Sequence, residues 1–267
     1  MKKYYLFIAL AMVAAMSVSC KNNNKKAKEA ADATAEVVEA AKTTLADDVL
    51  ATLDGFARVY TDADNVFSVP NIIAENLTEE EKLVKPDYLL DPGQVANLVT
   101  KSQKINALAI LFPEKTIRAA YGMPTQEVDE AIARLAAELN HPINLDDYKN
   151  LPLSEVVKKD YAQLKERGEL AYFWQFSFAC QTEMAYLFSQ NPDSFLRNIT
   201  EKQYQSYNNR FLSCIDAVKE LAKYDEEIAA AYKIFNDNKT EEGKGAFSTL
   251  ENAKRTFSTK TEIFAAR

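Results

Sequence analysis

Glycine is scarce in this chain, with only 6 glycines among 267 residues, or about 2% against a usual share of about 7%. Tight β-hairpin turns and phosphate-binding loops both place glycine at positive φ, so this content argues against both structures. Apolar residues recur instead at helical spacing along most of the chain. The sequence therefore predicts an all-α fold, an irregular bundle of about eight or nine helices.

The overall composition is that of a chain that folds around a core. Hydrophobic residues make up 47% and charged residues 27%, which excludes a collagen-like repeat, a disordered tail and a disulfide-dense miniprotein. The single histidine, His141, excludes multi-histidine zinc or iron sites and leaves one imidazole for general-base chemistry. No serine or cysteine has a recognisable nucleophile context, so we expect His141 to be structural.

The first twenty residues are typical of a bacterial export signal that ends in a lipid-attachment cysteine. Two lysines precede an apolar stretch from Leu6 to Met16, too short to span a bilayer of about 30 Å but suited to a signal-peptide core. Small residues lead to Cys20 as in lipoprotein signals, although Ser17 stands where such motifs usually carry leucine. We expect residues 1–19 to be a cleaved signal peptide, lipid to be attached at Cys20, and residues 20–44 to be a polar tether. The alternatives are cleavage at an ordinary secretory site, which would give Cys20 no role, and an uncleaved membrane anchor.

The charge of the mature chain bears on its contact with the membrane and with nucleic acid. Removing the two lysines of the signal from 32 basic residues leaves 30 against 39 acidic residues, a formal charge of −9. Such an acidic chain suits nucleic acid poorly, so we expect no nucleic-acid partner. Four lysines between positions 21 and 28 would lie beside anionic headgroups. We expect an envelope protein held at the membrane by its lipid, with the leaflet and surface exposure left open.

Residues 45–267 are expected to form a single helical domain. Apolar stripes predict helices over about 45–60, 91–113, 125–139, 154–168, 169–190, 200–221 and 225–235, and a last one from about residue 240. Prolines make residues 61–93 irregular, except for a short helix capped by Thr78 and Glu81. Pro192 is expected to end the helix over 169–190, and Thr200 to cap the next one. Pro113 is expected to end the second helix, with a further turn or two as far as Tyr121. Five residues on the inward faces of the two most regular helices should be buried: Phe173, Phe176, Phe211, Ile215 and Val218.

The strongly apolar helix predicted over 169–190 carries polar residues that need an explanation. Ser177 and Gln181 fall on one face with Trp174, and Glu183 falls near Tyr172. A buried polar group costs about 1–3 kcal/mol unless it is hydrogen-bonded. Two interpretations stay open. Either neighbouring helices satisfy these groups, or all five residues line an amphipathic pocket for a flat or apolar ligand.

Motifs of metal, phosphate or nucleophile sites are missing from the sequence. Paired CxxC, HExxH, GxSxG and phosphate-binding loops are all absent. Asp62 and Asp64 resemble the start of a calcium loop, but the next ligand and glycine positions carry Val66 and Phe67. The absence of these motifs therefore predicts no metal site, no cofactor and no catalytic residue.

Cys180 and Cys214 lie on consecutive predicted helices. In an antiparallel pair they would differ in height by about one helical turn, which is borderline for a disulfide because its Cα atoms must lie within about 7 Å. An exported protein meets an oxidising compartment. A disulfide and two buried free thiols both remain open.

Residues 86–190 contain a recognisable series of helical segments. The run PDYLLDPGQVANLVTKSQKINALAIL is followed by DEAIARLAAELNHP and then by the aromatic helix. With its Asp-Pro opening, Asn97 and the run from Arg134 to Ala136, this region resembles a group of uncharacterised all-helical bacterial lipoproteins. The resemblance implies a helical fold and a location at the envelope. It implies no activity.

These observations together favour a lipid-anchored, periplasm-facing protein that acts by binding a partner protein or a small ligand. An enzyme that uses carboxylates is the alternative, because carboxylates are the chemistry that the sequence supplies. A binding protein predicts a groove or patch whose residues have ordinary pKa values. An enzyme predicts aspartates and glutamates that converge in a cleft with shifted pKa values.

Replacing Cys20 with alanine should abolish incorporation of radiolabelled palmitate and move the protein out of the membrane fraction, since the thiol that carries the lipid is gone. The Cys180→Ala variant keeps the predicted attachment site and should keep the label. Unchanged labelling of the Cys20→Ala protein would contradict the assignment.

Overall fold

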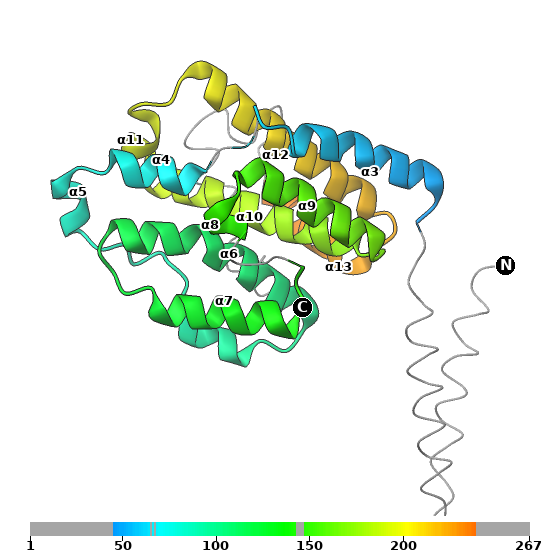
Figure 1. Cartoon of the computed structure of the whole chain (residues 1–267), viewed down its shortest axis with the longest axis horizontal. Helices are drawn as coiled ribbons and strands as arrows, with labels where there is room; N and C mark the ends of the chain where they lie inside the picture. The colour runs from blue at the N-terminus through cyan, green and yellow to red at the C-terminus, as the bar shows by residue number, and fades with distance from the viewer. Residues whose placement is uncertain (1–44, 65, 67, 143–146, 239–267) are drawn as a thin grey trace, which may run out of the picture. The chain divides into compact units, whose positions relative to one another are not determined.

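The computed structural model describes residues 45–64, 66, 68–142 and 147–238. The predicted signal peptide, Cys20, the tether and the predicted last helix from residue 240 lie outside the described residues. Within them the chain forms eleven α-helices and one 3-10 helix, and no strand (Figure 1). The predicted all-α fold is confirmed.

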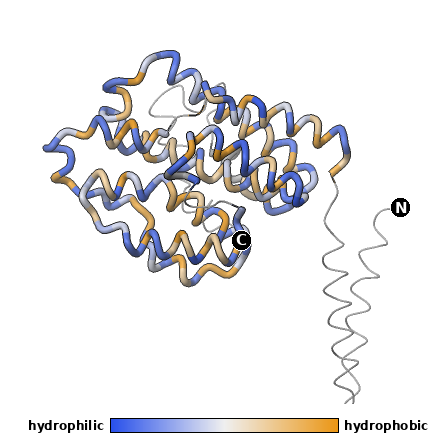
Figure 2. Tube along the Cα trace, viewed as in Figure 1, coloured by the Kyte–Doolittle hydropathy of each residue, from blue (hydrophilic) through white to orange (hydrophobic). Residues whose placement is uncertain are grey.

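The helices vary in length from a single turn to about six turns. They are α3 (Asp47–Tyr60), α4 (Val69–Asn76), α5 (Glu79–Leu83), η1 (Pro92–Asn97), α6 (Lys101–Ala120), α7 (Gln126–Glu138), α8 (Asp147–Asn150), α9 (Leu153–Glu166), α10 (Leu170–Gln190), α11 (Pro192–Leu196), α12 (Glu201–Leu221) and α13 (Glu226–Asn238). Hydrophobic and hydrophilic residues alternate along several of the longer helices (Figure 2). This periodicity is the pattern on which the prediction of the longer helices rests.

Capping boxes fix the start of three helices. The Thr78 hydroxyl accepts a hydrogen bond from the Glu81 backbone N–H at 3.2 Å, and the Glu81 carboxylate accepts one from the Thr78 N–H at 2.7 Å. Thr200 begins α12 in the same way, and both caps were predicted from the sequence. A third box, formed by Thr100 and Gln103, begins α6. Each box satisfies backbone donors that the first turn of a helix leaves unpaired.

The predicted helix over 91–113 is wrong in two respects. Asp91 does cap a turn, accepting from the Gly93 N–H at 2.9 Å, but that turn is the separate 3-10 helix η1. The α-helix starts only after Thr100, and it continues through Pro113 as far as Ala120. An interior proline costs about 3 kcal/mol through its missing N–H and its clash with the preceding turn. We attribute its tolerance here to burial, because α6 packs closely on α10 and α7 and buries Pro113 itself.

Two prolines lie in the first turns of short helices, Pro70 where no helix was predicted and Pro192 where it follows the end of α10 as expected. Pro70 lies in the first turn of α4, where the Ser68 hydroxyl accepts from the Asn71 N–H, and Pro192 is the first residue of α11. The first turn needs no backbone N–H from its residues, so proline fits there. Pro152 is the N-cap residue of α9, which begins at Leu153, one residue before the predicted start.

Helix α10 is buried around most of its circumference. Of its 21 residues, 16 are buried, and a helix that is apolar on every side belongs inside a protein. Helices α4, α6, α9, α11 and α12 all pack against it, and in Figure 1 it lies between α12 and α6. Helix α3 packs on α12 in turn. Helix α10 is therefore the centre of the described bundle.

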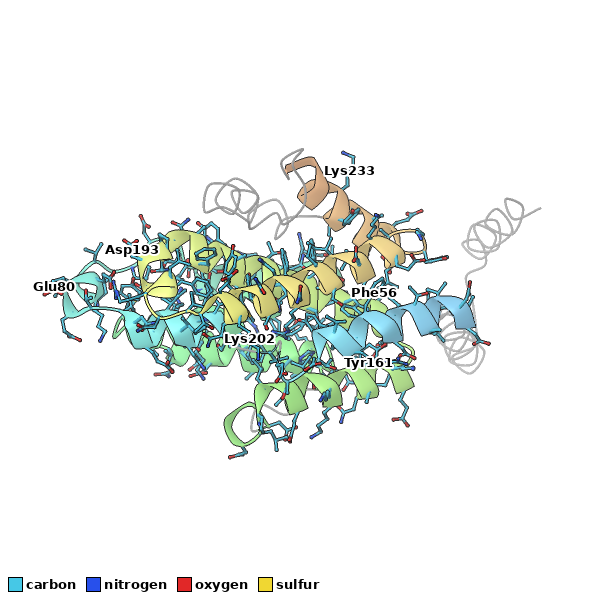
Figure 3. All side chains as sticks on the ribbon, turned by 90° about the horizontal axis from the view of Figure 1, so that it is seen from above. Phe56, Glu80, Tyr161, Asp193, Lys202 and Lys233 are labelled. Atoms are coloured by element: carbon cyan, nitrogen blue, oxygen red, sulfur yellow. The ribbon has the colours of Figure 1, made fainter. Side chains whose placement is uncertain are left out.

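Polar contacts join the outer helices to one another. The Tyr161 hydroxyl of α9 donates to the Asp54 carboxylate of α3 at 2.7 Å, and Lys165 binds the same carboxylate. Figure 3 shows these two helices side by side near the labels of Phe56 and Tyr161, with Lys202 and Glu80 on exposed surfaces.

Three of the five predicted core residues are buried, and two are not. Phe173, Phe211 and Val218 are at most 3% exposed. Phe176 and Ile215 are half-buried, so the prediction is wrong for both. Phe176 is partly accessible because it borders a cavity, and on α12 the neighbouring Cys214 takes the buried position instead of Ile215.

Replacing Phe211 with alanine should lower the free energy of unfolding by about 3–5 kcal/mol, because the phenyl ring is buried and its loss leaves a cavity. The matched control is Leu212→Ala on the next residue of α12, whose side chain is 40% exposed and should change stability by less than about 1 kcal/mol. Urea titrations of both variants measure the difference. Equal losses would show that the inward face of α12 is misassigned.

Candidate functional site

A cavity of about 590 Å³ lies among α3, α4, α6, α7, α9, α10 and α12. Its walls are mainly apolar and include Phe112, Ile132, Val157, Leu164, Phe173, Phe176 and Met184. Small-ligand sites commonly enclose about 300–1,000 Å³ and have such walls. This cavity is the candidate functional site of the described part of the chain.

One face of α10 forms a continuous wall of the cavity. Phe173, Phe176, Ser177, Cys180 and Met184 all line it, and their spacing of three and four residues places them on one side of a helix. The opposite side of α10 packs on other helices. The central helix thus provides both the core and one side of the site.

Arg210 of α12 is the buried cation of the cavity. The residue is only 3% exposed, and its Nε–H donates to the backbone carbonyl oxygen of Tyr60 at 3.0 Å. Its guanidinium carbon lies 4.3 Å from the centroid of the Tyr60 ring, within the range of a cation–π contact. Tyr60 ends α3, where the last carbonyls have no helical donor. Arg210 therefore completes the end of α3 while it lines the cavity.

Two groups beside Arg210, the Cys180 thiol and the Tyr60 phenol, are neutral at physiological pH. Burial raises the pKa of the Cys180 thiol to about 12, although the positive charge of Arg210 opposes the rise. Burial likewise raises the pKa of Tyr60 to about 12, again against the effect of Arg210. A thiol with so high a pKa is a poor nucleophile.

His141 lies at the α7 side of the same cavity. Its Nδ1 contacts the hydroxyl of Tyr172, and its ring centroid lies 5.0 Å from that of Phe176. Burial, with a smaller contribution from the positive charge of Arg167, lowers the pKa of His141 to about 3. The imidazole is therefore neutral near pH 7, and a general-base step would need a pKa close to the working pH.

The five residues proposed from the sequence as a pocket separate in the structure. Ser177 lines the cavity. Tyr172, Trp174, Gln181 and Glu183 are buried, each at most 3% exposed, and they do not line it. The Gln181 amide donates to the Tyr60 hydroxyl at 3.3 Å, and Trp174 packs edge-on against Tyr60 and Phe173. Tyr172, Trp174 and Gln181 thus each contact a residue that lines the cavity.

Arg210 was missed when the sequence was read for candidate site residues. It lies three residues after Tyr207 and four before Cys214, which places it on the apolar stripe of α12. The signal in the sequence was a charged residue within the apolar stripe that α12 turns toward the core. Cys180 and Cys214 are both free thiols, so the open question of a disulfide is answered against one.

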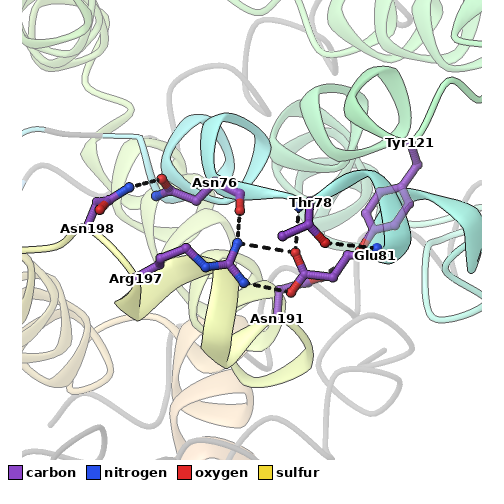
Figure 4. Close-up of polar contacts among 7 residues, drawn as sticks. All are labelled: Asn76, Thr78, Glu81, Tyr121, Asn191, Arg197 and Asn198. Atoms are coloured by element: carbon purple, nitrogen blue, oxygen red, sulfur yellow. Dashed lines mark hydrogen bonds and ion pairs between the residues drawn. The ribbon is translucent and has the colours of Figure 1, made fainter.

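Three of the residues drawn in Figure 4, Glu81, Tyr121 and Asn191, border a second, smaller cavity of about 340 Å³. Arg197 forms an ion pair with Glu81 at 3.0 Å and contacts the carbonyl oxygen of Asn76. The hydrogen bond from Arg197 lowers the pKa of Glu81 to about 2. Because these groups bind one another across α4, α5 and the end of α11, we interpret the cluster as a link between the segments.

Two further carboxylates with lowered pKa values lie on the outer helices. Burial raises the pKa of Asp54, but the hydrogen bonds from Lys165 and Tyr161 outweigh it and lower the pKa overall. The hydrogen bond from Lys104 lowers the pKa of Glu138. Asp54, Glu81 and Glu138 are all outside the lining of the larger cavity.

Across the part of the chain that the structure describes, no group of three or more His, Cys, Asp or Glu side chains could hold a metal ion. None of the described helices combines the length and hydropathy that crossing a membrane requires. The chain matches no protein-family model, no curated protein and no solved structure. The candidate site is therefore judged on its own geometry.

The His141 imidazole should show no titration between pH 5 and pH 8, because its folded pKa is lowered to about 3. It is the only histidine, so its ring-proton NMR signals are unambiguous. In the unfolded chain the pKa is about 6.5, so acidification protonates the unfolded state first. The contribution to stability is complete above about pH 6.5 and decreases as the pH falls toward 3. A ring signal that titrates near pH 6.5 would contradict the buried, neutral assignment.

Proposed function

We propose that the protein is a lipid-anchored envelope protein that binds a small, mainly apolar molecule in the larger cavity. The observation that carries the proposal is the cavity of about 590 Å³ with aromatic and aliphatic walls. Burying apolar ligand surface there contributes about 25 cal/mol for each Å² removed from water. The sequence left open a partner protein or a small ligand, and a cavity of this volume with mainly apolar walls favours the small ligand.

The chemistry of the lining also favours binding over catalysis. The neutral His141, with its pKa lowered to about 3, and the Cys180 thiol, with its pKa raised to about 12, are both far from the pKa of a group that exchanges protons at neutral pH. The carboxylates Asp54, Glu81 and Glu138, whose pKa values are lowered, bind cations away from the cavity. The carboxylate-based enzyme therefore stays the weaker of the two hypotheses.

The location at the membrane rests on the sequence. It is supported by the signal that ends in Cys20 and by the resemblance of residues 86–190 to all-helical bacterial lipoproteins. A tether of residues 20–44 would connect the anchor to the helical bundle. A membrane-bound protein of this kind would meet apolar molecules at the surface where they are concentrated.

Binding can be measured with N-phenyl-1-naphthylamine, a neutral probe whose fluorescence rises in an apolar site. The full chain carrying Cys20→Ala is used, because attached acyl chains and detergent would compete for an apolar cavity. We expect saturable, one-to-one binding. Ser177→Leu, which adds volume to the cavity wall, should weaken binding at least about tenfold, or about 1.4 kcal/mol.

The control for this experiment is Gln190→Leu, which adds an apolar side chain at an exposed position of α10 that borders the smaller cavity and lies outside the larger one. It should leave binding unchanged. Circular dichroism shows whether each variant folds. If Ser177→Leu does not fold, Cys180→Leu replaces it as a second cavity-filling variant. Equal affinity of the cavity-filling variant, the Gln190→Leu control and the parent protein would refute the cavity as the binding site.

A further inference from the structure

We infer that the cavity selects molecules with a carboxylate head group and an apolar body, and that Arg210 binds the carboxylate. This inference rests on the proposed function, because it names the class of ligand that the same cavity takes. It goes further in assigning a residue and a charge to the recognition.

Arg210 has more hydrogen-bond donors than the protein uses. A guanidinium group carries five N–H donors, and the Nε–H is bound to the Tyr60 carbonyl oxygen. The four N–H groups on Nη1 and Nη2 have no acceptor among the described residues, and none of the described carboxylates forms an ion pair with Arg210. Arg210 lines the cavity and is 97% buried. A buried charge of this kind is costly unless an anion pairs with it.

The two contacts with Tyr60 fix the orientation of the guanidinium plane. The carbonyl oxygen of Tyr60 holds Nε, and the ring of Tyr60 lies against one face of the group. Parallel donors from Nη1 and Nη2 match the two oxygens of a carboxylate. Since the side chain is already held in place, little side-chain entropy is lost when the ligand binds. Arg210 is thus prepared for a planar anion.

None of the other charged groups that line the cavity is a buried cation that could bind the carboxylate of the ligand. Lys115 and Asp129 form an ion pair with each other, and both side chains are more than 40% exposed. Asp160 of α9 is buried and already takes part in an interaction of its own, and its negative charge contributes to the raised pKa of Tyr172. His141 is neutral. The buried positive charge of the cavity therefore belongs to Arg210.

The remaining walls suit the apolar part of such a ligand. Phe112, Ile132, Phe176 and Met184 line the same cavity as Arg210 and the exposed pair of Lys115 and Asp129. A ligand with a carboxylate at one end and a hydrocarbon body would place each part against a matching surface. A purely apolar ligand would leave the guanidinium without an anion. A purely polar ligand would bury no apolar surface against the aromatic walls.

The test compares three molecules with the same hydrocarbon chain and different head groups. Dodecanoate, dodecan-1-ol and dodecylammonium compete with bound N-phenyl-1-naphthylamine on the full chain carrying Cys20→Ala, below their aggregation concentrations. We expect dodecanoate to displace the probe at a concentration at least about tenfold lower than dodecan-1-ol, and dodecylammonium to be the weakest. Equal displacement by dodecanoate and dodecan-1-ol, or a preference for dodecylammonium, would overturn the inference.

Variants of Arg210 identify the residue that makes the selection. Arg210→Met should remove the preference for dodecanoate over dodecan-1-ol, because the guanidinium that pairs with the carboxylate is gone. Arg58→Met removes a positive charge at an exposed position of α3 outside the cavity and should keep the preference. An Arg210→Met protein that folds and still prefers dodecanoate would contradict the assignment.

The design separates failure of this inference from failure of the proposed function. If the neutral probe does not bind in a saturable manner, the proposed function fails. If the probe binds but the head groups do not differ, only the role of Arg210 fails. Should Arg210→Met not fold by circular dichroism, the comparison of head groups on the parent chain still decides, and Arg210→Lys, which keeps the charge but loses the planar fork, should reduce the preference.

Discussion

The burial of α10 on nearly all sides is the constraint from which the rest of the described structure follows. A helix with aromatic and aliphatic residues around its circumference has no face to offer to water, so five other helices enclose it. Its polar residues must then find partners inside the protein. The Gln175 amide does so by donating to the Ser102 hydroxyl and to the Asn106 side chain of α6. Enclosure of one helix therefore determines which faces of its neighbours turn inward.

The same constraint accounts for the position of the cavity. Helices of different lengths and directions cannot fill all the space around a central helix that carries several large rings. Where α10 presents Ser177 and Cys180, both short side chains, space remains between α10 and the helices on either side. Tyr60 and Arg210 close that space at one point by binding each other. Small residues on the central helix are thus as important for the site as the aromatic ones.

Local signals predicted the fold well, and long-range contacts limited the prediction of the site. The caps at Thr78 and Thr200 could be read from the sequence because all their atoms lie within four residues. The path of α6 through Pro113 could not, since packing against α10 decides it. Arg210 meets the carbonyl of Tyr60 across 150 positions. No spacing rule connects two residues so far apart, so the most informative side chain of the site was visible only in three dimensions.

Trp174 gives the bundle an internal optical signal. It is the only tryptophan of the chain, fully buried, and its indole Nε1 has no hydrogen-bond partner among the described residues. An indole in such apolar surroundings emits at short wavelength. Its ring lies edge-on to Tyr60 and Phe173, two residues that line the cavity. Any molecule that shifts either ring changes the surroundings of this single chromophore, so the native protein reports on the state of its own interior without a label.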